Sequence, residues 1–239
     1  MYEDRVVAFI DILGFSNLVN KKESSTDIII QIVENLQRIS LEAGMDDEPE
    51  YGFTYDRQVS LFSDNIVISY RNEGPAEYYL TRELMVLQIA MMIVGIHIRG
   101  GLTIGKLYHK GSLVIGPALI RAYDLESKVA IYPRIVFDNT TQSDWCMLAE
   151  DYDGIYFIDF LGNPSEWSYY IEKTEGITHK EVLSQIYEAC CDIPEISDLR
   201  VKAKHEWLKK YILESIIIKD DIKPIRINHK MYKRAGFKV

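Results

Sequence analysis

Two aspartates lie at the ends or turns of apolar segments, where a carboxylate needs a partner. Asp11 closes the apolar run from Val6 to Ile10, and Asp64 lies between two largely apolar runs, 59–62 and 66–68. A buried carboxylate stays ionised only when a metal, a cation or several hydrogen bonds stabilise it. Divalent cations such as Mg²⁺ and Mn²⁺ prefer oxygen ligands of this kind. We therefore interpret Asp11 and Asp64 as a pair of candidate metal ligands, although turn formation is the simpler explanation for either aspartate alone.

A glycine-containing turn follows Asp11 at once, and its backbone amides are candidates for holding phosphate. Exposed N–H groups of such a turn bind phosphate oxygens, because several of them point the same way. The residues of this candidate phosphate loop are Leu13, Gly14, Phe15 and Ser16. Arg99 opens the Gly-rich segment 99–105 and is equally consistent with phosphate binding and with a structural ion pair at a strand end.

The elements that must position these residues follow from the hydrophobic pattern. Apolar runs predict strands over 5–12, 57–62, 65–70, 96–105, 107–114, 129–137 and 155–160, and helical periodicity predicts helices over 26–43, 76–94, 117–127, 178–191 and 197–215. Asp64 then occupies the turn of the first hairpin, and strands 96–105 and 107–114 form a second one. This order predicts an α+β fold, with helices covering one side of an antiparallel-rich sheet.

The composition is that of an ordinary globular protein, with 47% apolar and 26% charged residues. No apolar stretch approaches the length of a membrane span, and the N-terminus lacks the pattern of a secretory signal, so we expect a cytoplasmic protein without a membrane partner. The three cysteines have no metal-type spacing. A net charge of −9 argues against a nucleic-acid binder, which needs a basic field, whereas divalent cations would still allow a nucleotide substrate.

Four segments, in this order and with this approximate spacing, resemble the catalytic domain of class III nucleotidyl cyclases. They are FIDILGF from Phe9, LFSDNIVIS from Leu61, IRGGLTIG from Ile98 and VIGPALIRAYDLES from Val114. The resemblance covers residues 5–137, and several features are most similar to the Pycsar pyrimidine cyclases of bacterial antiphage defence. It implies a ferredoxin-like class III cyclase core in a catalytic domain of residues 1–177, with a helical extension, 178–239, packed on it.

The resemblance also implies roles for the candidate site residues. Asp11 and Asp64 would bridge two Mn²⁺ or Mg²⁺ ions, and Ile12 would offer its backbone carbonyl to one of them. The candidate phosphate loop would wrap the triphosphate of the substrate, and Arg99 would bind phosphate or form an ion pair. The family further implies a homodimer with both active sites at the interface.

The helix after Gly116 departs from the purine cyclases at two positions. Those enzymes commonly carry an Asn four residues after this glycine and an Arg eight residues after it, which orient the ribose and stabilise the leaving pyrophosphate. The corresponding residues here are Ile120 and Asp124. Arg121 lies on a different helix face from Asp124 and is only a weak substitute, although it or Arg99 is a candidate to act across the dimer boundary.

The position expected to recognise the base also differs from that of the adenylyl cyclases. The position four residues before Asp64, where adenylyl cyclases place a lysine, is Ser60. A pyrimidine pocket can be narrowed by an aromatic ring, and Tyr55, with Tyr51 and Arg57 beside it, is the candidate nucleotide-binding residue for this role. In a chain with 16 tyrosines, ordinary packing is the simpler explanation for any one of them.

These features together imply a pyrimidine nucleotide cyclase. It would convert UTP or CTP, with UTP slightly favoured, to the 3′,5′-cyclic monophosphate and pyrophosphate by two-metal catalysis, as the signal generator of antiphage defence. The absent Asn and Arg keep two alternatives open. One is a catalytically degenerate nucleotide sensor or dimerisation module with a cyclase-like fold, and the other is an atypical purine cyclase.

Overall fold

The computed structural model describes residues 1–16, 18, 27, 29–31, 34, 47–48, 53–54, 56–140, 147–162, 164–176, 178–191, 196 and 198–217. Its elements are β1 (Glu3–Ile12), β2 (Asp47–Glu48), β3 (Phe53–Thr54), β4 (Gln58–Phe62), β5 (Asn65–Arg71), α3 (Ala76–Ile93), β6 (Ile98–Lys110), β7 (Leu113–Ile115), α4 (Pro117–Asp124), the π-helical turn η2 (Leu125–Val129), β8 (Ile135–Phe137), β9 (Leu148–Glu150), β10 (Tyr156–Ile158), α5 (Pro164–Glu175), α6 (His179–Cys191) and α7 (Leu199–Ile217). Most of the helix predicted over 26–43, and both Tyr51 and Tyr55, lie outside the described residues.

The main sheet has the strand order β4-β5-β1-β6-β8-β10-β9, and β7 pairs with β6. β1 is antiparallel to both of its neighbours, β5 and β6, whereas β6 and β8 run parallel. With α3 between β5 and β6, the four strands β4, β5, β1 and β6 have the order of a ferredoxin-like sheet. The predicted α+β class with an antiparallel-rich sheet is confirmed.

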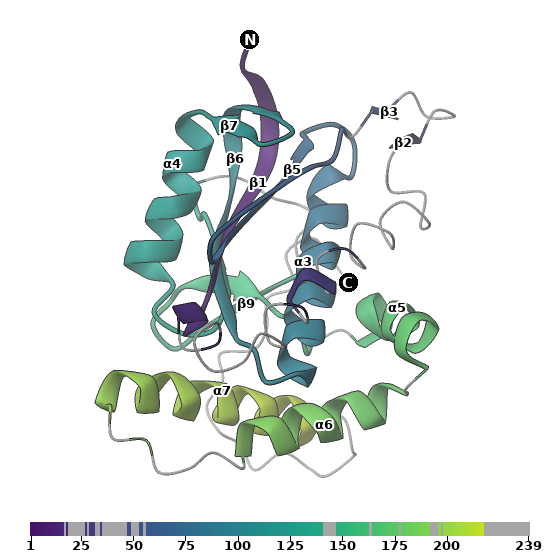
Figure 1. Cartoon of the computed structure of the whole chain (residues 1–239), viewed down its shortest axis with the longest axis vertical. Helices are drawn as coiled ribbons and strands as arrows, with labels where there is room; N and C mark the ends of the chain where they lie inside the picture. Colours follow the sequence, from purple (N-terminus) through teal and green to yellow (C-terminus); the bar gives the residue numbers. More distant parts are fainter. Residues whose placement is uncertain are drawn as a thin grey trace.

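The central strand β1 is buried on both faces, which explains why its sequence is continuously apolar instead of alternating. Val6, Ala8 and Ile10 belong to the large core cluster on the α3 side, and Val7 and Phe9 belong to a second cluster that includes residues of α4. Figure 1 shows α3 and α4 on opposite sides of the sheet. The expectation that helices cover one face only is therefore wrong in this detail.

Gly101 on β6 permits the close approach of α4 and η2 to the sheet. A Cβ atom at this position would collide with the backbone carbonyl oxygen of Ala122 and would lie 2.5 Å from Leu125 Cβ. Because backbone atoms cannot give way as a flexible side chain can, the position requires glycine. The Gly-rich segment thus holds the end of α4, and the η2 turn after it, tightly against the strand that carries Arg99.

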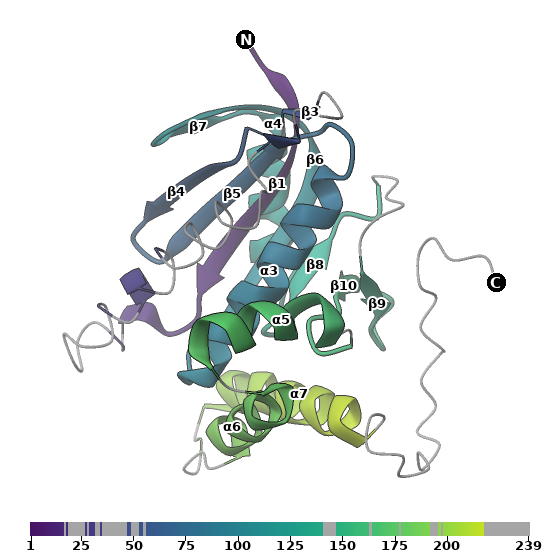
Figure 2. The ribbon, with the colours of Figure 1, turned by 90° about the vertical axis from the view of Figure 1, so that its right-hand side faces the viewer.

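The C-terminal helices α6 and α7 lie beneath the sheet and α3, and α5 lies across the lower part of α3 (Figure 2). Val182 and Ile186 of α6 and Leu208 and Ile212 of α7 are part of the same core cluster as α3. A capping box precedes α6, with Glu181 Oε2 accepting the Thr178 amide at 2.7 Å. The division into a 1–177 domain and a 178–239 extension stays a prediction, although the described helices of that extension share a core with the sheet domain.

Several predicted boundaries are wrong. β6 is one continuous strand from Ile98 to Lys110, and its hairpin with β7 turns at Gly111, whose φ is +57°. The strand predicted over 129–137 is reduced to β8, because η2 and an irregular turn containing Pro133 occupy the residues before it. The strand β9 and the helix α5 have no counterpart among the predicted elements.

Candidate active site

The register of the sheet brings Asp11 and Asp64 to the same end of neighbouring strands. Asp11 pairs with Asn65 across β1 and β5, and Asp64 precedes Asn65 in the β4–β5 turn. The amide of Ile12 donates a hydrogen bond to the backbone carbonyl of Asp64 at 2.9 Å, which fixes this turn to the end of β1. Two aspartates separated by more than fifty residues in the sequence are thus positioned side by side by backbone pairing.

Arg99 lies directly opposite Asp11 on the other neighbouring strand, β6. Its Nε donates to Asp11 Oδ2 at 3.1 Å, and its second guanidinium nitrogen forms an ion pair with Glu126 Oε1 at 2.7 Å. Of the two roles considered for Arg99, the structure contains the ion pair. A guanidinium that joins two carboxylates holds the end of β1 to the η2 turn.

Glu126 is a member of this site that the sequence prediction did not include. Its side chain is only 4% exposed. Burial raises the pKa of Glu126, the Arg99 guanidinium opposes this shift, and the charge of Asp11 adds to it. The residue belongs to the segment RAYDLES, but its position on a π-helical turn that faces β6 becomes evident only in the folded chain.

The candidate phosphate loop is a tight turn that leads into a helix. Gly14 adopts a φ of +74°, a conformation that favours glycine, and the Leu18 amide donates to the Gly14 carbonyl at 3.2 Å. Gly14 and Ser16 are exposed, whereas Phe15 packs partly buried against the main core. The amide of Leu13 donates to the His97 carbonyl at 2.9 Å, so the start of the loop is fixed to the segment before β6.

The carboxylate oxygens of Asp11 and Asp64 are suitable ligands for a divalent cation. Asp11 uses Oδ2 to accept from Arg99, and Asp64 uses Oδ1 to accept from Asn65 Nδ2 at 2.9 Å. Within the described residues, the second oxygen of each carboxylate has no hydrogen-bond partner. The same residues contain no group of three or more His, Cys, Asp or Glu side chains suited to a metal. A cation here would therefore complete its ligands with backbone, water or phosphate oxygens, as Mg²⁺ commonly does.

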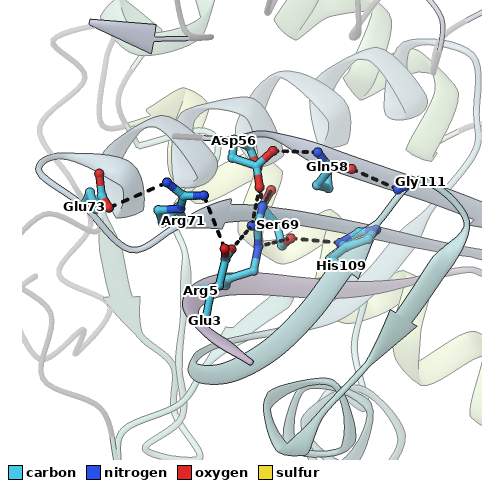
Figure 3. A network of polar contacts seen from close by, with 9 residues as sticks. All are labelled: Glu3, Arg5, Asp56, Gln58, Ser69, Arg71, Glu73, His109 and Gly111. Carbon is cyan, nitrogen blue, oxygen red and sulfur yellow. Dashed lines mark hydrogen bonds and ion pairs between the residues drawn. The ribbon is translucent and has the colours of Figure 1, made fainter. Parts of the chain in front are cut away.

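Ser60, at the position of the purine-binding lysine, belongs to a buried network at the other end of the strands. Its Oγ donates to the Gly111 carbonyl at 2.8 Å and lies 2.9 Å from His109 Nε2. The other ring nitrogen lies 2.8 Å from Ser69 Oγ, which accepts from Arg5 Nε at 2.9 Å (Figure 3). The Ser60 hydroxyl is thus engaged as a donor and as an acceptor, which leaves little capacity for recognising a base.

The other residues considered for a base pocket are Tyr51, Tyr55 and Arg57. Tyr55 and Tyr51 lie outside the described residues. Arg57 forms an ion pair with Glu83 of α3, whose side chain is 3% exposed, and Nε donates to Glu83 Oε2 at 3.1 Å. Tyr70 donates to the same carboxylate at 2.7 Å. Arg57 therefore binds the first hairpin to α3.

The α4 positions that depart from purine cyclases are on the surface. Ile120 is 65% exposed, and Asp124 forms an ion pair with Lys128 at 2.7 Å. Arg121 donates twice to Asp138, from Nε at 2.8 Å and from a terminal nitrogen at 2.7 Å. The Arg121 guanidinium and the Thr103 and Thr140 hydroxyls hold the pKa of Asp138 well below its usual range, against the effect of burial.

No protein-family model and no curated protein sequence matches this chain. Among solved structures, similarity is found to the catalytic core of a rhodopsin-guanylyl cyclase with converted specificity, in complex with ATPalphaS, at 12% identity and a TM-score of 0.40, over 66% of this chain and 96% of that chain. A bacterial light-regulated adenylyl cyclase has 12% identity and a TM-score of 0.41, over 89% of this chain and 58% of that one. A class III adenylyl cyclase-like ATP-binding protein from Pseudomonas aeruginosa has 16% identity and a TM-score of 0.38, over 87% of this chain and 44% of its own length. Identities and TM-scores this low carry no argument about function.

None of the helices in the described part of the chain is long and apolar enough to cross a membrane.

The chemistry that the site can support follows from its own geometry. Two aspartates at neighbouring strand ends, an exposed glycine turn after one of them and a guanidinium paired with it form an arrangement suited to a metal-bound polyphosphate.

Proposed function

We propose that this protein is a nucleotidyl cyclase that converts a pyrimidine nucleoside triphosphate, UTP or CTP, to its 3′,5′-cyclic monophosphate and pyrophosphate. The observation that carries this proposal is the register that places Asp11 and Asp64 together, fixed by the hydrogen bond from Ile12 to the Asp64 carbonyl. The ordered series of sequence segments that resembles class III cyclases supports the same reaction. A role in antiphage signalling is supported by the sequence resemblance alone.

In this proposal each residue near the turn has a defined task. Asp11 and Asp64, with the Ile12 carbonyl, would hold two Mn²⁺ or Mg²⁺ ions, which when bound would neutralise the phosphates and lower the pKa of the ribose 3′-hydroxyl. The amides of Gly14, Phe15 and Ser16 would bind the phosphate oxygens, since the Leu13 amide already donates to the His97 carbonyl. Arg99 would hold Asp11 in place through Nε. The 3′-oxygen attacks the α-phosphorus and loses its proton to solvent, and the bond from that phosphorus to the bridging oxygen breaks to release pyrophosphate.

A homodimer with sites at the interface is part of the proposal. Exposed apolar side chains on the α4 side of the sheet support it: Phe62 of β4 is 47% exposed, and Tyr123 of α4 is 49% exposed. Both rings contact Phe9 edge-on, at centroid distances of 6.4 and 5.4 Å. A second copy of the chain would cover these rings and bring its own groups to the site.

Incubation of the protein with each of the four ribonucleoside triphosphates and Mn²⁺, followed by mass identification of products, tests the reaction. We expect cyclic UMP or cyclic CMP, and little cyclic product from ATP or GTP. Cyclic AMP or cyclic GMP as the main product would point to an atypical purine cyclase instead.

A second candidate function, a nucleotide sensor without turnover, is favoured by one observation. The α4 side chains that would orient ribose and pyrophosphate are replaced by an exposed Ile120 and by Asp124, which is paired with Lys128. Nucleotide binding without any cyclic product in the same incubation would select this function.

A further inference from the structure

The helix α7, from the C-terminal end of the described chain, reaches the candidate active site. The ring of His205 packs edge-on against the ring of His97, with centroids 5.6 Å apart and an interplanar angle of 79°. His97 is the residue whose carbonyl accepts the Leu13 amide at the start of the candidate phosphate loop. α7 therefore contacts the segment that supports this loop and that leads into Arg99.

Lys204, the residue before His205, places a second positive charge beside this site. Its side chain is partly buried, and it interacts electrostatically with Arg99, Asp11 and Glu126 of the site and with Asp198, which precedes α7. Burial and the neighbouring Arg99 guanidinium lower the pKa of Lys204, so its charged form would gain from a further anion. The Arg99 guanidinium is already in contact with both carboxylates. In the described part of the chain, Lys204 forms no ion pair.

The position of Lys204 is fixed by the anchoring of α7. One turn further along, Trp207 Nε1 donates to Asp151 Oδ2 at 2.7 Å, and its ring stacks on Tyr132 with centroids 5.4 Å apart. Tyr211 donates to Asp159 Oδ1 at 2.6 Å and is itself 6% exposed. A helix held at successive turns by hydrogen-bonded aromatic rings presents Lys204 from a rigid element.

We propose that Lys204 is a phosphate-binding residue of the site, so that α7 forms part of the catalytic unit. This inference rests on the proposed function. The ligand would be the β- and γ-phosphates of a nucleoside triphosphate, or the pyrophosphate that leaves. An ammonium group suits this task because it is a compact charge with three donors on a flexible stem. The alternative is that Lys204 only balances the charge of Glu126.

Calorimetric titration with a non-cleavable analogue, α,β-methylene-UTP or α,β-methylene-CTP, in the presence of Mn²⁺ distinguishes these roles. We expect Lys204→Gln to bind the analogue about tenfold more weakly than the wild type, which is the loss of one charge-assisted hydrogen bond. Lys209→Gln, which removes an exposed lysine of the same helix, should bind like the wild type. Lys204→Arg, which keeps the charge, should recover most of the affinity.

The melting temperature of each variant, measured without nucleotide, controls for folding. Binding of the analogue by Lys204→Gln with wild-type affinity would overturn the inference and leave the proposed cyclase intact. Equal weakening by Lys204→Gln and Lys209→Gln would also overturn it, because only bulk charge would then matter. Failure of the wild type to bind either analogue would overturn the proposed function and the inference together.

Discussion

Arg99 and Asp11 face each other across the β1–β6 pairing, and the Arg99 Nε donates to Asp11 Oδ2 at 3.1 Å. The same guanidinium reaches Glu126 on the η2 turn at 2.7 Å. The proposed metal ligand is therefore held by a cation that is itself held by a buried acid. This chain of contacts links the end of the central strand to the segment after α4.

Removing the Arg99 guanidinium should destabilise the protein, and a second substitution, at Glu126, should restore part of the lost stability. Arg99→Gln leaves the nearly buried Glu126 carboxylate without its cation, so we expect a loss of about 1–3 kcal/mol in the free energy of unfolding. Adding Glu126→Gln should recover part of that loss, because the unpaired charge is then gone. Urea unfolding of both single variants and the double variant gives the coupling energy. Strictly additive effects would contradict the ion pair.

Gly101 should be the least replaceable glycine of β6. Gly101→Ala would force a Cβ atom into the backbone of Ala122, and we expect a loss of about 3 kcal/mol or a failure to fold. Gly105→Ala is the matched control on the same strand, because its Cβ atom would meet only Ala118, with the Ala118 Cβ at 3.3 Å. Thermal unfolding compares the two variants. A smaller loss for Gly101→Ala than for Gly105→Ala would contradict the close packing of α4 on β6.

The buried His109 should make stability depend on pH below neutrality. Burial, assisted by Arg5, lowers the pKa of His109 from 6.5 to about 4. The unfolded chain then binds the proton more readily than the folded chain, so this contribution to stability is complete above about pH 6.5 and is lost as the pH falls toward 4. Between pH 7 and 4.5 the loss is on the order of 2 kcal/mol.

Urea unfolding of His109→Gln and of the wild type across this pH range isolates the effect. The wild type should lose more stability than the variant between pH 7 and 4.5, because the other titrating groups are common to both. An identical pH dependence of the two proteins would contradict a neutral His109 between Ser60 and Ser69.

Arg121 should matter for stability but not for turnover. Its guanidinium donates twice to the buried Asp138, from Nε and from one terminal nitrogen, and this bidentate pair holds the side chain against that carboxylate. We expect Arg121→Gln to keep the rate of cyclic product formation within about twofold and to lose about 1 kcal/mol of stability, because the side chain is 43% exposed. A large loss of kcat with an unchanged melting temperature would instead assign Arg121 to the reaction.

The parts of the fold that the sequence predicts well are those with a strong local pattern. The strand over 5–12, the first hairpin and the helix over 76–94 match β1, β4–β5 and α3 closely, because apolar runs and turn residues mark their ends. The sequence pattern predicts the turn of the second hairpin too early in the chain. Gly105 and Lys106 have the residue types of a turn, but both continue the pairing of β6 with β1, and the chain turns further on, at Gly111.

The residues of the candidate site also divide into those that a local sequence pattern marks and those that it does not. Asp11, Asp64 and Arg99 could be singled out because each terminates or opens an apolar strand, and pairing of those strands brings them together. Glu126 and Lys204 could not, because a Glu on an apparently helical segment and a Lys among many on a C-terminal helix carry no local signal. Their positions arise from packing of η2 on β6 and from the contact of α7 with His97, which are long-range contacts.

The most direct test of the two-aspartate site is formation of cyclic pyrimidine nucleotide, measured by mass spectrometry with Mn²⁺ and saturating UTP or CTP, for the wild type and Asp64→Asn. We predict that the substitution lowers the rate about a hundredfold or more, since neutralisation of phosphate charge by a metal accounts for several kcal/mol of the barrier. Asp4→Asn, which changes an exposed aspartate of β1, should keep the wild-type rate and melting temperature. Wild-type rates in a folded Asp64→Asn protein would contradict the account.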